Sequence, residues 1–467
     1  MPFRLSLGVR ERGLALSAVA HVPDLAWIDE FIDRVRPYVY VRPLDNLIIK
    51  RPNQAQKLNP QGVAILKALL RGQTVSQVLD RIGREPRRVR DLQLFMLEVK
   101  RFLEGTLDEM TRSSAVDVQP YAMRFSRLPV LSEVALTYRC NLKCTFCYAG
   151  CNCTTNPVGD DREMSTAQVR KVLDAIRHDA QVPSVSFTGG EPTLRADLVQ
   201  LIAHAKTLDM RVNLITNGTQ LTAERARALA EAGLDSAQVS LEGVTAETHE
   251  RITQVRHSFE RTVAAVGHLK ATGVAVHTNT TINRENLLEC TEVPGFVQRA
   301  LGNDRFSMNL VIPTGSAALD ERLVVRYRDV GSHLLAIQAE SRKRGVEFMW
   351  YSPTPLCLFN PIAEGLGNKG CAACEGLLSV GANGDVLPCA SYDESVGNLL
   401  DRDVLTVWQS ARAEQFRDKF LAHPECRSCE HFQVCNGACP LYWRQMGFDE
   451  LSARNRFQSV TMEHFLQ

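Results

Sequence analysis

The arrangement that most constrains the fold is an alternation, across residues 131–345, of apolar runs of strand length with segments of helical periodicity. This order is typical of parallel βαβ units, in which each helix returns the chain to the start of the next strand. Six runs predict an α/β fold with an open or partial (β/α)6 barrel, because a closed barrel of this kind needs eight strands. The runs are LSEVALTY, PSVSFTGG, RVNLITNG, SAQVSLEG, VAVHTNTTIN and RFSMNLVIP.

Polar motifs lie at the carboxyl ends of these predicted strands. RCNLKC follows the first run, while GGEP, TNG and SLEG close the second, third and fourth. Folds built from parallel βαβ units place their chemistry at this edge, where strands end and loops begin. The sequence therefore predicts an active site there.

Five of the fourteen cysteines lie close together in the loop after the first run. Cys140, Cys144 and Cys147 follow a C-x3-C-x2-C spacing, so three thiolates can meet at one site. Three cysteines on a [4Fe–4S] cubane leave one iron open to a second cofactor. A zinc site is the alternative, with Cys151 or Cys153 as fourth ligand. We favour the interpretation of these two as ordinary buried thiols.

Taken together, the cysteine spacing and the GGEP loop resemble the radical S-adenosylmethionine (SAM) superfamily, over about half the chain. The resemblance implies that the three cysteines hold a [4Fe–4S] cluster and that reductive cleavage of SAM gives a 5′-deoxyadenosyl radical. It implies that the GGEP loop meets the SAM amino group and that later strand ends meet its ribose and carboxylate. The residues it assigns to SAM binding are Phe146, Gly189, Gly190, Glu191, Pro192, Thr216, Asn217, Ser240, Glu242 and Arg251.

A second cysteine-rich pattern occupies residues 346–467, where glycine becomes frequent and regular periodicity fades. Its spacings, C-x9-G-x4-C and then C-x2-C-x5-C-x3-C, resemble the SPASM extension of radical SAM enzymes, which holds one or two auxiliary iron–sulfur clusters. A zinc ribbon is the alternative, since paired C-x2-C motifs also serve zinc. The candidate ligands are Cys357, Cys371, Cys374, Cys389, Cys426, Cys429, Cys435 and Cys439.

The resemblance divides these cysteines between two clusters. It assigns Cys389, Cys439 and two of Cys357, Cys371 and Cys374 to the first. The second would be held by Cys426, Cys429 and Cys435.

Family members supply a further cysteine at this point, and this chain has none beyond Cys439. An oxygen ligand such as Asp449 or Glu450, a cysteine from elsewhere and an open iron are the alternatives for the second cluster. Cys290, away from both motifs, is interpreted as structural.

Residues 37–108 combine short extended stretches around LDNL with three helical segments. Pro60 and Pro86 stand at helix starts, and Gly72 and Gly83 at helix ends. This predicts a winged helix and resembles the PqqD-like recognition module of ribosomal peptide maturation. The resemblance implies binding of a precursor's leader peptide as an added strand. DNA binding is the alternative, because Lys and Arg exceed Asp and Glu by six over residues 1–112.

Composition narrows the setting. The net charge is +1, so no global field attracts nucleic acid or an anionic membrane, which leaves only a local basic patch for such a partner. The absence of a run of 18 apolar residues argues against a membrane span. Clustered cysteines favour metal ligation in a reducing, cytoplasmic compartment over disulfides. The predicted domains are an extension (1–36), the winged helix (37–108), a linker (109–130), the barrel (131–345) and the SPASM domain (346–467).

The sequence therefore predicts a radical SAM/SPASM maturase that oxidises, and by our first hypothesis cross-links, a residue of a precursor peptide. A flavodoxin- or ferredoxin-type protein would supply electrons. An epimerase would need a hydrogen-atom donor, for which Cys151, Cys153 and Cys357 are candidates. One alternative is a small-molecule substrate such as a tetrapyrrole or quinone precursor. The other is an iron–sulfur sensor that binds DNA.

Overall fold

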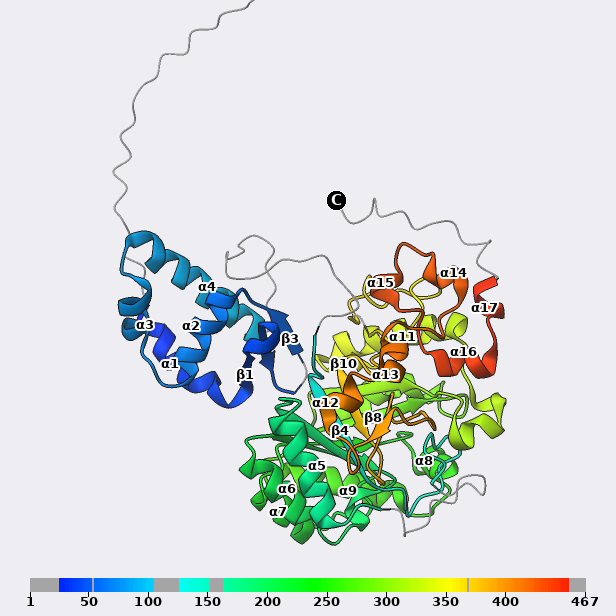
Figure 1. Ribbon diagram of the computed structural model, residues 1–467. Helices are drawn as coiled ribbons and strands as arrows, with labels where there is room; N and C mark the ends of the chain where they lie inside the picture. Colours follow the sequence, from blue (N-terminus) through cyan, green and yellow to red (C-terminus); the bar gives the residue numbers. More distant parts are fainter. Residues whose placement is uncertain (1–24, 53, 105–125, 152–162, 368, 453–467) are drawn as a thin grey trace, which may run out of the picture. The chain divides into compact units, whose positions relative to one another are not determined.

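The computed structural model describes residues 25–52, 54–104, 126–151, 163–367 and 369–452 (Figure 1). The chain forms two compact units. One comprises residues 1–37 and 57–117, and the other residues 38–56 and 118–467. The winged helix with the bounds 37–108 therefore remains a prediction. Residues 38–56, which carry its first strands, belong to the larger unit.

The smaller unit is helical. Its second and fourth helices begin at Pro60 and Pro86, and Gly72 and Gly83, which follow the second and third, have positive φ. Proline fits the first turn because its missing N–H has no partner there, and glycine accepts positive φ without strain. The first helix was not predicted. The four helices are α1 (Ala26–Val35), α2 (Pro60–Leu70), α3 (Val75–Ile82) and α4 (Pro86–Glu104).

A small sheet opens the larger unit, with strand order β1-β2-β3. The turn predicted at LDNL is confirmed, with Asn46 in the left-handed conformation. The Arg42 guanidinium pairs there with Asp45 at 2.9 Å, fully buried, and donates to the carbonyl oxygen of Pro129 at 2.7 Å. This contact fastens the turn to the segment before the barrel. The strands are β1 (Val39–Arg42), β2 (Leu47–Lys50) and β3 (Gln54–Lys57).

The main sheet has the strand order β10-β9-β8-β7-β6-β5-β4-β11-β12-β13. All six predicted strands are confirmed as β4 to β9, and they pair in parallel. The predicted barrel stopped at residue 345, but β10 adds a seventh parallel strand beyond β9. The bounds are β4 (Leu131–Thr137), β5 (Ser184–Gly189), β6 (Arg211–Thr216), β7 (Ser236–Ser240), β8 (Ala275–Ile282), β9 (Arg305–Leu310) and β10 (Glu347–Trp350).

Helices cover one face of this sheet, and Figure 1 shows α5, α6, α7 and α9 grouped along it. Strand side chains that face these helices, such as Leu136, Phe187 and Leu214, are fully buried in the main core. Successive side chains of a strand point to opposite faces. The helices are α5 (Thr166–His178), α6 (Leu198–Thr207), α7 (Ala223–Glu231), α8 (Ala246–Thr253), α9 (Ser258–Lys270), α10 (Val293–Arg299) and α11 (Tyr327–Arg344).

The opposite face of the sheet is polar. Glu133, Ser186, Asn213 and Ser236 are register partners on four neighbouring strands. The Asn213 amide donates to Ser186 at 3.2 Å and accepts from Ser236 at 2.8 Å. A continuous polar row therefore lines the interior of the partial barrel, which suits a polar substrate better than a structural core.

The carboxy-terminal segment continues the same sheet. β11 (Leu377–Val380) pairs in parallel with β4, and β12 (Asp385–Leu387) and β13 (Gly397–Asn398) follow antiparallel. Short helices then lead to an aromatic cluster in which the ring centroids of Tyr327 and Tyr442 are 4.1 Å apart. These helices are α12 (Val404–Trp408), α13 (Ala411–Arg417), α14 (Pro424–Arg427), α15 (Phe432–Cys435), α16 (Pro440–Met446) and α17 (Asp449–Ser452).

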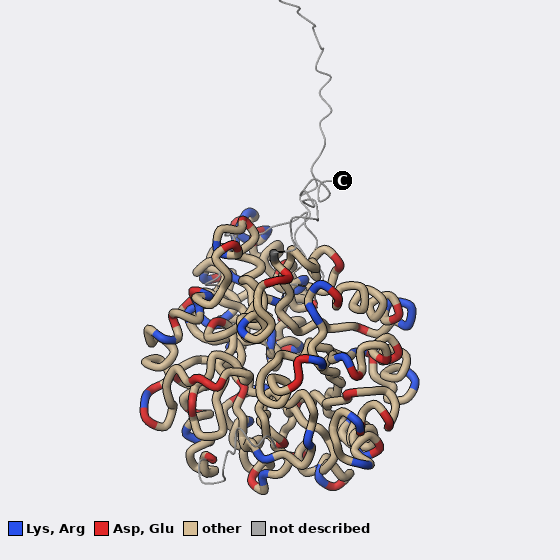
Figure 2. Tube along the Cα trace, turned by 90° about the vertical axis from the view of Figure 1, so that its right-hand side faces the viewer, with Lys and Arg blue, Asp and Glu red and all other residues tan. Residues whose placement is uncertain are grey.

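Charged residues of both signs are interspersed along the trace (Figure 2). Among the residues that the structure describes, no helix combines the length and the apolar character needed to cross a bilayer.

Candidate active site

The loop that carries Cys140, Cys144 and Cys147 leaves the carboxyl end of β4 and is held from two sides. The amides of Lys143 and Thr145 each donate to carbonyl oxygens of the last two residues of α8 at 3.0 Å. The amide of Ser316 donates to the carbonyl oxygen of Cys147 at 2.8 Å. These backbone hydrogen bonds fix the path of the loop that carries the three cysteines.

The three thiols lie within electrostatic range of one another. Burial raises the pKa of Cys140 to about 11, and burial with the charge of Glu242 raises the pKa of Cys144 well above its usual value. A hydrogen bond with the thiol of Cys151 lowers the pKa of Cys147 to about 6. Iron binding must deprotonate Cys140 and Cys144, whose pKa values are raised, so it releases protons. The structure places Cys151 beside the motif, and Cys153 lies outside the described residues.

Three thiols are the number that binds a [4Fe–4S] cubane with one iron left open. Each thiolate of a [4Fe–4S] cluster binds a different iron, so the sulfurs need not surround one point. Zinc instead requires its sulfurs at about 2.3 Å from a single ion. Within the described ranges, no group of three or more His, Cys, Asp or Glu residues is arranged to hold one metal ion.

The GGEP loop runs directly against the cysteine loop. The Gly190 amide donates to the carbonyl oxygen of Thr137 at 2.8 Å, and the Glu191 amide to that of Arg139 at 2.9 Å. A Cβ on Gly189 would lie 2.2 Å from the Thr137 oxygen, and one on Gly190 2.2 Å from the Arg139 oxygen. The close approach of the two backbones explains why this motif needs glycine.

The Glu191 side chain points into the protein. Its carboxylate is fully buried and accepts hydrogen bonds from the hydroxyls of Thr193 at 2.6 Å and Thr216 at 2.7 Å, and from the Asn217 amide at 2.8 Å. Burial raises its pKa, and these bonds oppose the rise. Glu191 therefore clamps the end of β5 to the end of β6, and the loop backbone remains for a ligand. Pro192 begins the short 3-10 helix that follows.

Asn217 connects the third strand end with the cysteine loop. Its amide nitrogen donates to Asn141 at 3.0 Å and lies 3.9 Å from the sulfur of Cys140. Its oxygen accepts from the Thr219 amide at 2.9 Å. The structure thus brings Cys140, a predicted cluster ligand, close to Asn217, a predicted SAM-binding residue from a distant part of the sequence.

The fourth strand places Ser240 and Glu242 on the same edge. Ser240 is the register partner of Asn279 on β8. Glu242 is 4% exposed, accepts from the Thr281 amide at 3.0 Å, and has its pKa raised to about 8 by burial. Electrostatic contact with Cys144 places this carboxyl close to the cysteine loop.

Arg251 and Phe146 are the remaining residues assigned to SAM. The Arg251 guanidinium on α8 donates to the carbonyl oxygen of Glu285 at 3.0 Å. Phe146 is partly buried in the cysteine loop itself. All ten residues thus occupy the cysteine loop or the carboxyl-terminal edge of strands β5 to β7 and the helix that follows, while their roles toward SAM stay a prediction.

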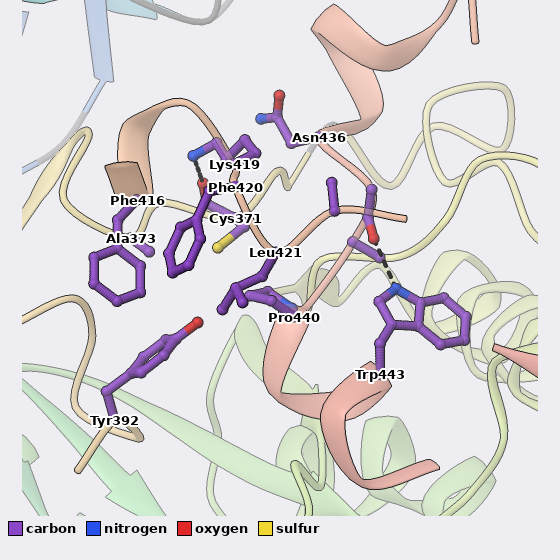
Figure 3. A pocket seen from close by; sticks show the side chains of 13 residues that line it. Cys371, Ala373, Tyr392, Phe416, Lys419, Phe420, Leu421, Asn436, Pro440 and Trp443 are labelled. Carbon is purple, nitrogen blue, oxygen red and sulfur yellow. Dashed lines mark hydrogen bonds between the residues drawn. The ribbon is translucent and has the colours of Figure 1, made fainter. Parts of the chain in front are cut away.

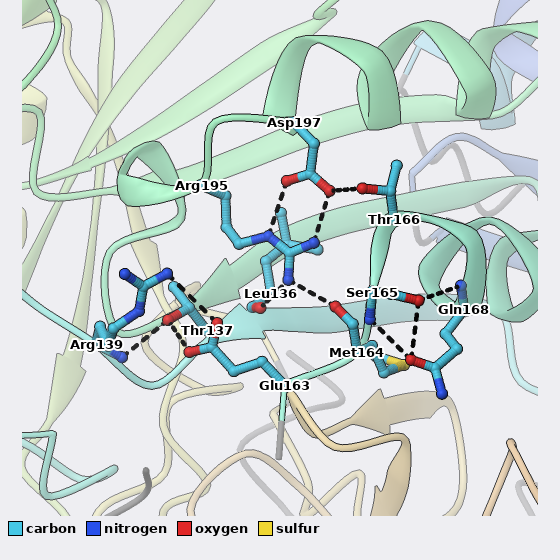
Figure 4. A network of polar contacts seen from close by, with 10 residues as sticks. All are labelled: Leu136, Thr137, Arg139, Glu163, Met164, Ser165, Thr166, Gln168, Arg195 and Asp197. Carbon is cyan, nitrogen blue, oxygen red and sulfur yellow. Dashed lines mark hydrogen bonds and ion pairs between the residues drawn. The ribbon is translucent and has the colours of Figure 1, made fainter. Parts of the chain in front are cut away.

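A polar network fixes the entrance to the cysteine loop (Figure 4). The Arg195 guanidinium forms a bidentate pair with Asp197 at 2.8 and 2.6 Å and donates to the carbonyl oxygen of Leu136 at 3.1 Å. The Arg139 amide donates to the Thr137 hydroxyl at 3.0 Å. The network therefore ties the end of β4 to the segment after β5.

Four carboxy-terminal cysteines form a first group around Cys371. Its charge contributes to the raised pKa values of Cys374 and Cys439, both about 12, and to that of Cys389, although burial is the main cause for all three. A pocket with about 330 Å³ of empty space is lined by Cys371 and by both chain neighbours of Cys439 (Figure 3). The Nζ of Lys419 donates to the carbonyl oxygen of Cys371 at 2.7 Å. This group fits a four-cysteine cluster.

A second group comprises Cys426, Cys429 and Cys435 on and beside α14 and α15. The Cys429 amide donates to the carbonyl oxygen of Cys426 at 3.1 Å, which folds the C-x2-C segment into a turn. Glu450, a predicted oxygen ligand, is buried, and its carboxylate accepts from the Tyr442 hydroxyl and from a backbone amide.

Two known protein families match this chain, one over the barrel and one over the carboxy-terminal segment. Residues 134–291 match the radical SAM superfamily, and residues 371–430 match SPASM, an iron–sulfur cluster-binding domain. The PqqA peptide cyclase of Rhizobium meliloti is 30% identical over 325 residues, which cover 67% of this chain and 82% of that protein. This chain belongs to the radical SAM superfamily.

Other relatives of this radical SAM enzyme differ in name. The AdoMet-dependent heme synthase of Nitratidesulfovibrio vulgaris is 27% identical over 326 residues, 65% of this chain and 85% of that protein. The crystal structure of Streptococcus suis SuiB bound to precursor peptide SuiA matches with a TM-score of 0.63, covering 86% of this chain and 94% of SuiB, at 17% identity. That likeness confirms the radical SAM fold with a SPASM domain.

The cofactors follow from this membership. The radical SAM enzyme uses a [4Fe–4S] cluster, auxiliary iron–sulfur clusters and SAM, as predicted. The assignment of individual cysteines to each cluster remains a prediction, which the two groupings above support.

A small cavity of the radical SAM enzyme escaped the sequence analysis. It is lined by Glu133, Tyr138, Tyr148 and Ser379, among others. The Ser379 hydroxyl donates to Glu133 at 2.7 Å, and burial raises the pKa of this carboxyl. The sequence contained one signal for this cavity. Glu133 is a charged residue inside the apolar run LSEVALTY, and it lies on the strand face opposite Val134.

A buried histidine predicts how stability depends on pH. His249 is 1% exposed and accepts from the Glu242 amide through Nδ1 at 3.2 Å, while its Nε2 has no hydrogen-bond partner among the described residues. Burial lowers its pKa to about 4, so the unfolded chain takes up a proton first as pH falls. We expect this group to cost about 1.5 kcal/mol of unfolding free energy between about pH 6.5 and 5.

Denaturant unfolding of the reconstituted enzyme at both pH values measures this loss. The control is His249→Asn, which keeps an acceptor for the Glu242 amide and does not titrate. An equal loss in wild type and variant would contradict the prediction.

Proposed function

We propose that this enzyme oxidatively modifies a residue of a ribosomally made precursor peptide, by cross-linking it in our first hypothesis. The cavity beside Glu133 supports the proposal, because its lining includes the chain neighbours of one predicted ligand from each cysteine motif. Tyr148, directly after Cys147, lines one side, and Ala390, directly after Cys389, lines another. When bound, SAM and its cluster supply the radical that abstracts a substrate hydrogen, and a nearby auxiliary cluster accepts an electron.

The residues around this cavity would orient the substrate. Glu133 holds its proton to higher pH than an ordinary carboxyl because it is buried. Tyr148 is hydrogen-bonded to Thr188, which fixes its ring against the cavity. A substrate residue brought to this cavity would meet the hydrogen-bonding carboxyl group of Glu133.

The partner's leader would bind at residues 37–108. β3 lies at an edge of the three-stranded sheet, and its residues are partly exposed or exposed. Extended peptides add as strands at sheet edges, so the edge position of β3 supports the predicted β-augmentation. A flavodoxin- or ferredoxin-type donor would reduce the clusters.

Some relatives have names that favour a peptide substrate, and others have names that favour a tetrapyrrole substrate. PqqA peptide cyclase and SuiB with its precursor peptide favour a peptide. The heme synthase relatives favour the second candidate, a tetrapyrrole substrate. Since these relatives are enzymes, the DNA-binding sensor is no longer considered.

The direct test incubates the anaerobically reconstituted enzyme, SAM and reductant with either a short precursor peptide encoded nearby or a tetrapyrrole precursor. We expect loss of a pair of hydrogen atoms from the peptide by mass spectrometry, dependent on its leader. Conversion of the tetrapyrrole alone would overturn the proposal and support the second candidate.

Glu133→Gln tests the cavity. We expect product formation to fall by at least about tenfold, because glutamine can still accept the Ser379 hydrogen bond but cannot give or take a proton, while SAM is still cleaved without coupling to product. The ratio of product to 5′-deoxyadenosine measures this.

The matched control is Glu347→Gln, the same change at a side chain that is 60% exposed on β10 of the same sheet. An unchanged ratio in Glu133→Gln would remove this carboxyl from the substrate site.

A further inference from the structure

The second group of carboxy-terminal cysteines lacks an obvious fourth ligand. Cys426, Cys429 and Cys435 supply three thiols, and the chain has no cysteine beyond Cys439. Glu450 is buried, and its carboxylate already accepts hydrogen bonds from the Tyr442 hydroxyl and from a backbone amide. A [4Fe–4S] cluster needs four ligands unless one iron is left open.

The residue before Cys357 contacts this group, although Cys357 precedes Cys426 by about seventy residues in sequence. The amide of Leu356 donates to the sulfur of Cys435 at 3.5 Å. Consecutive Cα atoms are about 3.8 Å apart, so this contact places the Cα of Cys357 within about 9 Å of the Cys435 sulfur. Backbone N–H groups that donate to ligand sulfurs are a regular feature of iron–sulfur sites, where they tune the potential.

The first group does not need Cys357. Cys371, Cys374, Cys389 and Cys439 already supply four thiols, and Cys371 interacts electrostatically with the other three. Cys357 itself is exposed in the loop that follows β10, so burial in the core does not account for its position.

We propose that Cys357 is the fourth ligand of the second auxiliary cluster, with Cys426, Cys429 and Cys435. The ligand then comes from the loop after β10 instead of from a position after Cys439. The cluster would cross-link the end of the barrel sheet to α14 and α15 and close a long loop, so that its binding also stabilises this part of the fold.

Spectroscopy of full-length enzyme tests this without any substrate. In a Cys140→Ala, Cys144→Ala, Cys147→Ala background, electron paramagnetic resonance of the reduced protein reports the auxiliary clusters alone. We add either Cys357→Ala or Cys429→Ala and expect both to remove or reshape the same signal, with iron falling by up to about four per chain. Combining the two should change nothing further, since residues acting as one unit are not additive.

Cys371→Ala is the matched control, because it belongs to the first group. It should affect the other signal and add to the effect of Cys357→Ala. Cys357→Ser distinguishes ligation from misfolding, since an oxygen ligand should shift the second signal while iron is retained. The proposal is overturned if Cys357→Ala alters the signal that Cys371→Ala alters, if it alters neither, or if no second auxiliary signal exists.

Discussion

Replacing Cys140, Cys144 and Cys147 together by alanine is expected to abolish cleavage of SAM. The rate of 5′-deoxyadenosine formation should fall by at least about 1000-fold, as after loss of any group essential to the chemistry. The physical reason is that these three thiols are the predicted ligands of the cluster that delivers the electron. Iron content should also fall by about four per chain, which measures the same loss independently of activity.

Cys290→Ala is the control for this experiment. Cys290 is buried and hydrogen-bonded to Asn286, outside the cysteine loop. The variant should lose some stability and keep its iron and its turnover per folded chain. If the triple variant still cleaved SAM under strong reductant, the assignment of the cysteine loop would be wrong.

Gly190→Ala is expected to weaken SAM binding by about 10- to 100-fold, because overpacking at a rigid contact costs about 1–3 kcal/mol. Its new methyl group would lie 2.2 Å from the carbonyl oxygen of Arg139, which immediately precedes Cys140. Both the GGEP loop and the cysteine loop must then move. Equilibrium binding of SAM to the reconstituted enzyme measures the effect.

Gly267→Ala makes the same chemical change where space is available. Gly267 is exposed on α9, and a Cβ there would meet no atom within 4 Å. Alanine in a helix interior is favoured over glycine by roughly 0.5–1 kcal/mol, so this variant should bind SAM normally and unfold at a slightly higher temperature. Equal SAM affinity in both variants would show that the close backbone contact is unimportant.

The sequence by itself determined the features that depend on short-range pattern. Strand-length apolar runs and helical periodicity predicted all six strands from β4 to β9. Motif positions at strand ends predicted where Cys140, Gly190 and Asn217 would meet, because parallel strands present their carboxyl ends at one edge. Cysteine spacing carried the family resemblance that implied both kinds of iron–sulfur site and left zinc as the alternative.

Only the tertiary structure decided which distant segments pair. It added β10 to the barrel sheet and joined β11 to β4, and so placed Ser379 against Glu133. It turned the Glu191 carboxylate inward and brought Leu356 against Cys435. Periodicity and spacing describe neighbours along the chain, whereas these contacts join residues far apart in sequence, and packing of the whole sheet selects them.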